Sequence, residues 1–111
     1  MSNDKQYKVL IAEDDTNYSS PLQLCINRSN NFSVLSVTDS ADDAYRLVKT
    51  GLPDVVIVDL DLADGNGISL LTKIRETENA LSVKPYLLVI TDFGDKSAAL
   101  AKAKEQGYKG V

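Results

Sequence analysis

The chain contains Val9-Leu10-Ile11-Ala12-Glu13 near its start and Val55-Val56-Ile57-Val58-Asp59 in its middle. Each stretch is four aliphatic residues closed by a carboxylate, with Asp14, Asp15 and Asp61 close behind. Aliphatic runs bounded by polar turns are typical of strands buried on both faces, and such strands are normally parallel. Because the carboxyl ends of parallel strands point the same way, we expect the carboxylates to gather at one edge of a sheet. Ligands of open α/β sheets bind outside that edge, so the pattern indicates a hard cation beside a phosphoryl group.

The remaining sequence alternates between strand and helix patterns. We predict strands at 7–13, 32–37, 54–59 and 85–91, and helices at 19–29, 40–50, 67–77 and 95–106. Strands that alternate with helices of this length imply right-handed βαβ units, and hence a parallel sheet covered on both faces.

The first helix contains a proline, Pro21. Proline removes a hydrogen bond from a helix interior, so we predict that the helix begins near Ser19 or Ser20 and that residues 16–18 form a loop. Cys25 would then lie on the inner stripe of the helix, where a free cysteine acts as a small buried hydrophobic residue.

Composition limits the classes of function. The 111 residues fit one compact domain, and a net charge of −4 disfavours nonspecific nucleic-acid binding by this segment. The start resembles no signal peptide and no apolar run is long enough for a membrane span, so we expect a soluble, cytoplasmic protein that does not bind membranes. Cys25 is the single cysteine and histidine is absent, which excludes an internal disulfide, serine-type triads and histidine-ligated zinc.

Three segments in this order carry a family resemblance. They are residues 11–15 (Ile-Ala-Glu-Asp-Asp), residues 58–67 (Val-Asp-Leu-Asp-Leu-Ala-Asp-Gly-Asn-Gly) and residues 89–91 (Val-Ile-Thr). Together they resemble the receiver domain of two-component response regulators, and the resemblance covers nearly the whole chain. It implies one receiver domain over residues 1–111, with a flavodoxin-like, doubly wound parallel sheet of strand order 2-1-3-4-5.

The resemblance also implies roles for individual residues. Asp59 would be the phosphoacceptor and Thr91 the switch hydroxyl, while Glu13, Asp14, Asp59 and the backbone carbonyl of Asp61 would hold Mg²⁺. The phosphoryl group would come from a histidine kinase or phosphotransfer protein, and the switch would change a protein-interaction surface around residues 92–106. Such a domain catalyses its own phosphorylation and dephosphorylation and is not an enzyme of the usual kind.

Some features depart from the family pattern and leave an alternative open. Asp92 follows Thr91 where the family usually has alanine or glycine, and the family's lysine after the fifth strand has no counterpart before Val111, because Lys109 comes too early. An inactive pseudo-receiver that only binds partners is therefore the alternative function.

The fifth strand itself is expected to be mostly absent, together with the fifth helix. The fourth strand would then be an unpaired edge, so we also predict self-association or low stability.

A second alternative is a phosphohydrolase of the haloacid dehalogenase type. Asp59-Leu60-Asp61 is an Asp-x-Asp at a strand end, with a nucleophile and a proton donor two residues later. The motif lies in the middle of the chain and lacks the usual following Gly-Thr, which disfavours this class.

Overall fold

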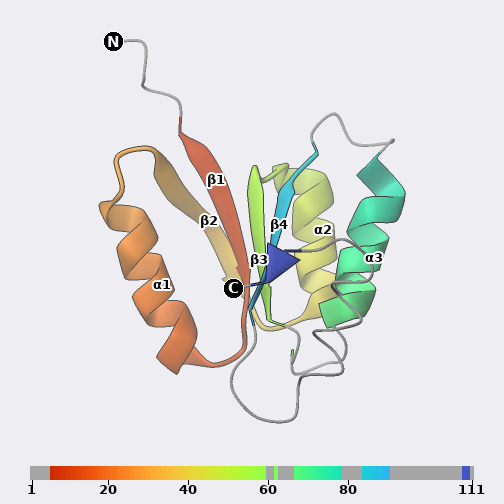
Figure 1. Ribbon diagram of the computed structural model, residues 1–111, viewed down its shortest axis with the longest axis horizontal. Helices are drawn as coiled ribbons and strands as arrows, with labels where there is room; N and C mark the ends of the chain where they lie inside the picture. Colours follow the sequence, from red (N-terminus) through yellow and green to blue (C-terminus); the bar gives the residue numbers. More distant parts are fainter. Residues whose placement is uncertain (1–5, 60–61, 63–66, 79–83, 91–108, 111) are drawn as a thin grey trace.

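The computed structural model describes residues 6–59, 62, 67–78, 84–90 and 109–110. The elements in chain order are β1 (Tyr7–Ala12), α1 (Thr16–Arg28), β2 (Phe32–Thr38), α2 (Ala41–Gly51), β3 (Val55–Asp59), α3 (Gly67–Thr77), β4 (Tyr86–Ile90) and β5 (Lys109–Gly110). The strands form one parallel sheet in the order β2-β1-β3-β4-β5 (Figure 1). The predicted flavodoxin-like α/β fold is therefore confirmed.

Most predicted boundaries agree with the structure within one residue. The helix predicted at 67–77 matches α3, and the one predicted at 40–50 is α2, shifted by one residue. The four predicted strands correspond to β1, β2, β3 and β4. The helix predicted at 95–106 lies outside the described residues.

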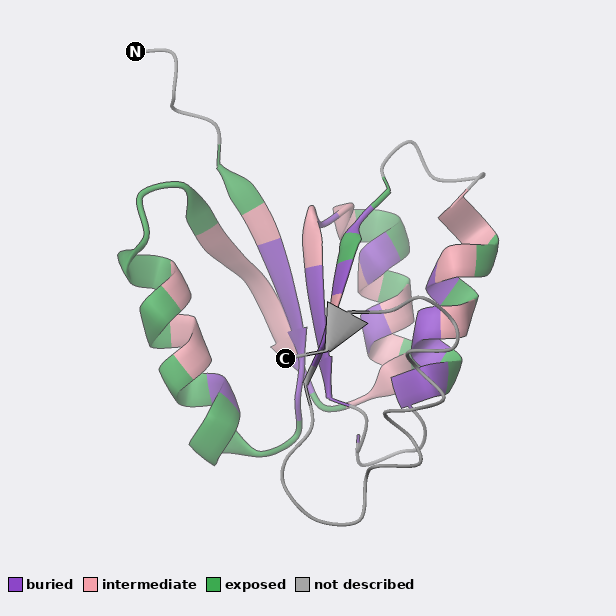
Figure 2. Ribbon diagram, viewed as in Figure 1, coloured by how far each residue is buried: buried purple, intermediate pink, exposed green. Residues whose placement is uncertain are grey.

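Helices cover both faces of the sheet. Figure 1 shows α1 on one face and α2 with α3 on the other. The side chains of β1 alternate accordingly: Leu10 and Ala12 belong to the larger hydrophobic cluster with α2 and α3, whereas Val9 and Ile11 belong to the smaller cluster with α1. Figure 2 shows β1 and β3 coloured as buried from their middle to their carboxyl ends, whereas most of β2 is intermediate. Burial of β1 on both faces explains why its sequence is a continuous apolar run.

The start of α1 differs from the prediction. The helix begins at Thr16 and contains Pro21, so residues 16–18 are helical and not a loop. Asp15 caps the helix: its carboxylate accepts a hydrogen bond of 2.9 Å from the amide of Asn17. The carbonyl that loses its helical partner to Pro21 belongs to Asn17, which is exposed, so water can satisfy it. A good cap and a solvent-facing carbonyl thus allow the proline inside the helix.

The prediction that Cys25 is buried is wrong. Cys25 is exposed on α1, because Leu22 and Ile26 face the sheet and Cys25 lies about 100° around the helix from Ile26. Its surroundings are therefore aqueous and not those of a core cysteine.

The fourth strand is not an unpaired edge. Leu88 and Val89 of β4 pair in parallel with Lys109 and Gly110 of β5. The fifth strand, expected to be mostly absent, is two residues long in the structure. Self-association stays a prediction.

Among the described residues, no helix has both the length and the apolar character needed to cross a membrane.

Two leucines test the packing. Leu71 of α3 is completely buried, whereas Leu24 of α1 is 54% exposed. We expect Leu71→Ala to lower the free energy of unfolding by about 2–5 kcal/mol, because it removes buried methyl groups and leaves a cavity. The matched change Leu24→Ala is expected to alter it by no more than about 0.5 kcal/mol. Denaturant titration of both variants measures the difference, and equal losses would contradict this packing.

Candidate functional site

The pairing of β1 with β3 brings two carboxylates together. Ala12 lies opposite Val58 in this parallel pair, so the next residues, Glu13 and Asp59, lie side by side at the carboxyl ends of their strands. Both are buried, with exposed fractions of 5% for Glu13 and 7% for Asp59. The predicted convergence of these acids at one edge of the sheet is therefore observed.

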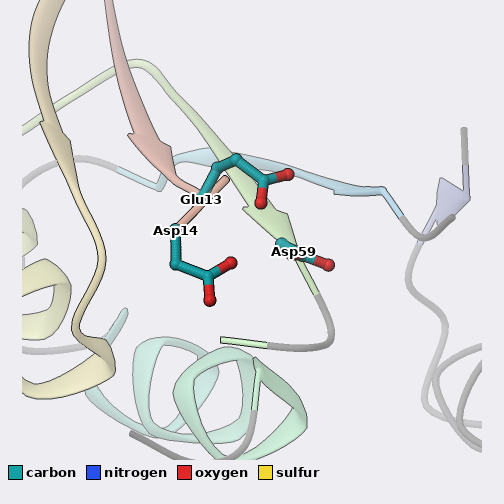
Figure 3. Close-up of side chains that lie close together, drawn as sticks. All are labelled: Glu13, Asp14 and Asp59. Carbon is teal, nitrogen blue, oxygen red and sulfur yellow. The ribbon is translucent and has the colours of Figure 1, made fainter. Parts of the chain in front are cut away.

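Asp14 completes a cluster of three acids. One carboxylate oxygen from each of Glu13, Asp14 and Asp59 lies within 4.8 Å of the others. Figure 3 shows the three side chains directed toward a common space at the ends of β1 and β3. Asp14 is exposed, whereas the other two acids are buried. The cluster is therefore open to solvent on the side of Asp14 and enclosed by protein on the side of Glu13 and Asp59.

The environment of Glu13 opposes its negative charge. Burial, followed by a hydrogen bond with Asp59, raises the pKa of Glu13 to about 8. Two buried carboxylates at this separation repel each other when both are ionised, and one proton held between them relieves the repulsion. A divalent cation can replace that proton, because it favours the ionised form of both groups. The carboxyl groups of Glu13 and Asp59 can therefore lie close together when either a proton or a cation offsets their charge.

Backbone contacts fix the position of Glu13. Its amide donates a hydrogen bond of 2.9 Å to the carbonyl of Thr38 at the end of β2. Its carboxylate accepts one of 3.1 Å from the amide of Asp15. Asp15 itself is the N-cap residue of α1, so it joins the site to the start of that helix. A helix-capping aspartate directly before Thr16 was the sequence feature that could have indicated this role.

Two predicted site residues cannot be compared with the structure. Asp61 and Thr91 lie outside the described residues. The backbone of Lys109 is described, and it lies opposite Leu88, which itself pairs with Ile57. Lys109 is therefore two residues short of the level of Asp59 along the strands, about 7 Å at the usual rise. This position agrees with the expectation that Lys109 comes too early to replace the family's lysine.

The sequence matches a known family over most of its length. Residues 9–111 match the family described as the response regulator receiver domain. A curated relative from Paramagnetospirillum magneticum, protein-glutamate methylesterase/protein-glutamine glutaminase 2, is 34% identical over 97 residues, which cover 87% of this chain and 26% of the relative. The chain thus spans about a quarter of the length of that protein.

Solved structures show the same fold. A two-component response regulator of the LuxR family from an Aurantimonas species superposes with a TM-score of 0.77 and 27% identity, covering 96% of this chain and 72% of that one. The response regulator domain of CheB from Thermotoga maritima has a TM-score of 0.81 at 17% identity, with 96% and 78% covered. The second similarity concerns the fold alone.

The raised pKa of Glu13 makes stability depend on pH. Its pKa is about 8 in the folded protein and near 4.5 in the unfolded chain, so between these values the folded state binds more protons. Without divalent cations, the free energy of unfolding should therefore fall as the pH rises from about 4.5 to about 8. Denaturant titrations across this range measure the slope.

Glu13→Gln is the matched control for this pH dependence. The amide does not titrate, so the decline over the same pH range should be much smaller in the variant. Mg²⁺ should reduce the decline in the original protein, because a bound cation stabilises the ionised carboxylates. An equal decline in both proteins would show that Glu13 is not its source.

Proposed function

Because this chain belongs to the receiver domains of two-component response regulators, we propose that Asp59 accepts a phosphoryl group from a histidine kinase or phosphotransfer protein. A carboxylate oxygen of Asp59 forms a bond to phosphorus as the phosphorus–nitrogen bond of a phosphohistidine breaks. The electron pair of that bond returns to the imidazole, which leaves and takes up a proton. The donor histidine belongs to the partner, since this chain contains none.

The main support for this proposal is the buried pair of Glu13 and Asp59. The buried end of β3 places Asp59 beside a second acid, an arrangement that costs free energy and serves no packing purpose. Carboxyl groups whose pKa is shifted by burial and by a neighbouring acid are typical of functional sites. Asp59 is the last residue of β3, and its carboxylate lies in the acid cluster that could hold the cation, so it is suited to act as the nucleophile.

The three acids fit a bound Mg²⁺. They supply oxygen ligands only, they lie within 4.8 Å of one another, and Asp14 leaves one side open to water. Mg²⁺ prefers oxygen ligands and usually keeps several waters. Glu13, Asp14 and Asp59 would hold it, together with the backbone carbonyl of Asp61. When bound, Mg²⁺ offsets the repulsion between Asp59 and the incoming phosphoryl oxygens.

Within this proposal, Thr91 is the switch hydroxyl. β4 pairs with β3 so that Asp59 lies opposite Ile90, and Thr91 is the next residue in the chain. A phosphoryl group on Asp59 adds charge and hydrogen-bond acceptors, which would draw the hydroxyl toward it and change the surface formed by residues 92–106.

The exposed side of α1 suits a partner's docking surface. Tyr18, Pro21 and Cys25 recur every three or four residues and are all exposed, although each has a largely apolar side chain. Tyr18 is 49% exposed and lies in the first turn of the helix, which begins two residues after Asp14. This stripe can pack against an apolar helix of the phosphodonor and place its histidine near Asp59.

Substitution of Asp59 tests the proposed phosphoacceptor. With acetyl phosphate and Mg²⁺, we expect the intact protein to gain the mass of one phosphoryl group, and Asp59→Asn to show no gain. Mass spectrometry of the intact chain measures this. The chelator EDTA should prevent the gain in the original protein, and Asp14→Asn should reduce Mg²⁺ affinity about 10-fold or more, because a neutral amide replaces a charged ligand.

Other outcomes would favour the alternative functions. An original protein that binds Mg²⁺ but never gains a phosphoryl group would support the inactive pseudo-receiver. Repeated turnover of an aryl phosphate, in place of a single phosphorylation, would support the phosphohydrolase.

Two tyrosines test the docking surface. Tyr18 and Tyr86 are exposed to similar extents, 49% and 53%, but Tyr86 starts β4 at the end of the sheet opposite to the site. We expect Tyr18→Ser to slow transfer from a phosphohistidine donor several-fold, about 1 kcal/mol of lost contact, and to leave phosphorylation by acetyl phosphate unchanged. Tyr86→Ser is the control and should change neither rate. Equal effects of both substitutions on transfer would contradict the α1 surface.

A further inference from the structure

The second strand carries an irregularity that determines which residue lies beside the site. Val9 of β1 pairs with Val34, but the next residue, Leu10, pairs with Ser36, so Leu35 is an extra residue in β2. The shift moves the end of β2 by one position and places Thr38 opposite Ala12. Without the extra residue, Val37 would stand there, and it has no hydroxyl group.

The extra residue, Leu35, contacts the C-terminal end of α2. The side chain of Leu35 lies so close to Gly51 that a Cβ atom at Gly51 would come within 2.7 Å of Leu35 Cδ2. β2 is therefore packed against the end of α2 at Leu35, and it contacts the start of α2 through Thr38.

Thr38 uses both its backbone and its side chain. It is buried, with 7% of its surface exposed, and its carbonyl accepts the 2.9 Å hydrogen bond from the amide of Glu13. Its hydroxyl Oγ1 donates to Asp43 Oδ2 at 3.0 Å and accepts from the amide of Ser40 at 3.2 Å. One residue thus connects Glu13 with the first turn of α2.

The first turn of α2 is itself held firmly. Ser40 caps the helix by accepting a hydrogen bond of 3.2 Å from the amide of Asp43. Asp43 also forms an ion pair with Arg46. Arg46 and the Thr38 hydroxyl lower the pKa of Asp43, so this carboxylate stays ionised and accepts the hydrogen bond from Thr38. The acceptor that orients Thr38 is therefore fixed by its own helix.

We propose that Thr38 is a positioning residue for the cation site: with Asp43 as its anchor, it fixes the peptide of Glu13 so that the carboxylates of Glu13 and Asp59 converge. The inference rests on the proposed function, because it concerns the same Mg²⁺ site. Groups that orient metal ligands affect metal affinity without touching the metal. No role for Thr38 was predicted from the sequence, since this residue lies outside the acidic motifs.

Substitutions at Thr38 test this role by calorimetric titration of the whole chain with Mg²⁺, at a temperature where each variant is folded. Thr38→Val keeps the shape and removes the hydroxyl, and it should weaken Mg²⁺ binding about 10-fold, whereas Thr38→Ser keeps the hydroxyl and should stay within about 2-fold. Thr50→Val is the matched control. Its hydroxyl donates to the carbonyl of Arg46 at 3.0 Å within α2, away from the site, so its loss should leave Mg²⁺ affinity unchanged.

A double-mutant cycle separates positioning from general destabilisation. Asp43→Ala should weaken Mg²⁺ binding in the same direction as Thr38→Val, and the double variant should bind no more weakly than Thr38→Val alone, because both changes break the same connection. Additive losses would overturn the proposal, as would unchanged affinity in Thr38→Val or an equal loss in Thr50→Val. If the original protein binds no Mg²⁺, the proposed function fails and this inference fails with it; if it binds and Thr38→Val binds equally well, only the inference fails.

Discussion

The parallel pairing of β1 with β3 is the constraint on which the site depends. Ala12 stands opposite Val58, and both are fully buried, so neither strand can slip by one residue without moving its apolar side chains to the wrong face. Because Glu13 and Asp59 are the next residues in their chains, the same register places them side by side at the edge of the sheet. The free energy of core packing thus maintains a contact between two acids that would otherwise separate.

That contact links the fold to its chemistry. Burial and the neighbouring Asp59 favour protonated Glu13, and the exposed Asp14 offers a third oxygen ligand from the solvent side. A cation that enters this space relieves a repulsion that is already present in the folded protein. Affinity for Mg²⁺ would then come from preorganised ligands, and the same cation would reduce the repulsion of an incoming phosphoryl group.

The sequence was a good guide to the sheet and to the buried half of the site. Aliphatic runs closed by acids predicted where β1 and β3 end, because burial on both faces leaves a continuous apolar pattern. The start of α1 was predicted incorrectly, since the cost of Pro21 was judged without the cap from Asp15. The burial of Cys25 was also predicted incorrectly, because helical spacing alone did not fix where the buried stripe of α1 ends. Local propensity is a weak guide where tertiary contacts and solvation can compensate.

The position of Thr38 could not be predicted from the sequence. Its place beside Glu13 depends on the extra residue in β2, and a register shift is a property of two paired strands that neither sequence segment contains alone. The contact of Leu35 with Gly51 likewise joins two elements that are separated in the chain. Positioning residues of this kind become visible only when the strands are aligned in space.

The most direct test of the account is to locate the phosphoryl group chemically. The protein is phosphorylated by a phosphohistidine donor with Mg²⁺, and the acyl phosphate is then reduced with borohydride, which converts a phosphorylated aspartate into homoserine. We predict that peptide mass spectrometry finds homoserine at position 59. When Mg²⁺ is omitted from the phosphorylation step, we predict that no homoserine forms there. Homoserine at Asp14 or another aspartate, or equal conversion of Asp59 without Mg²⁺, would contradict the account.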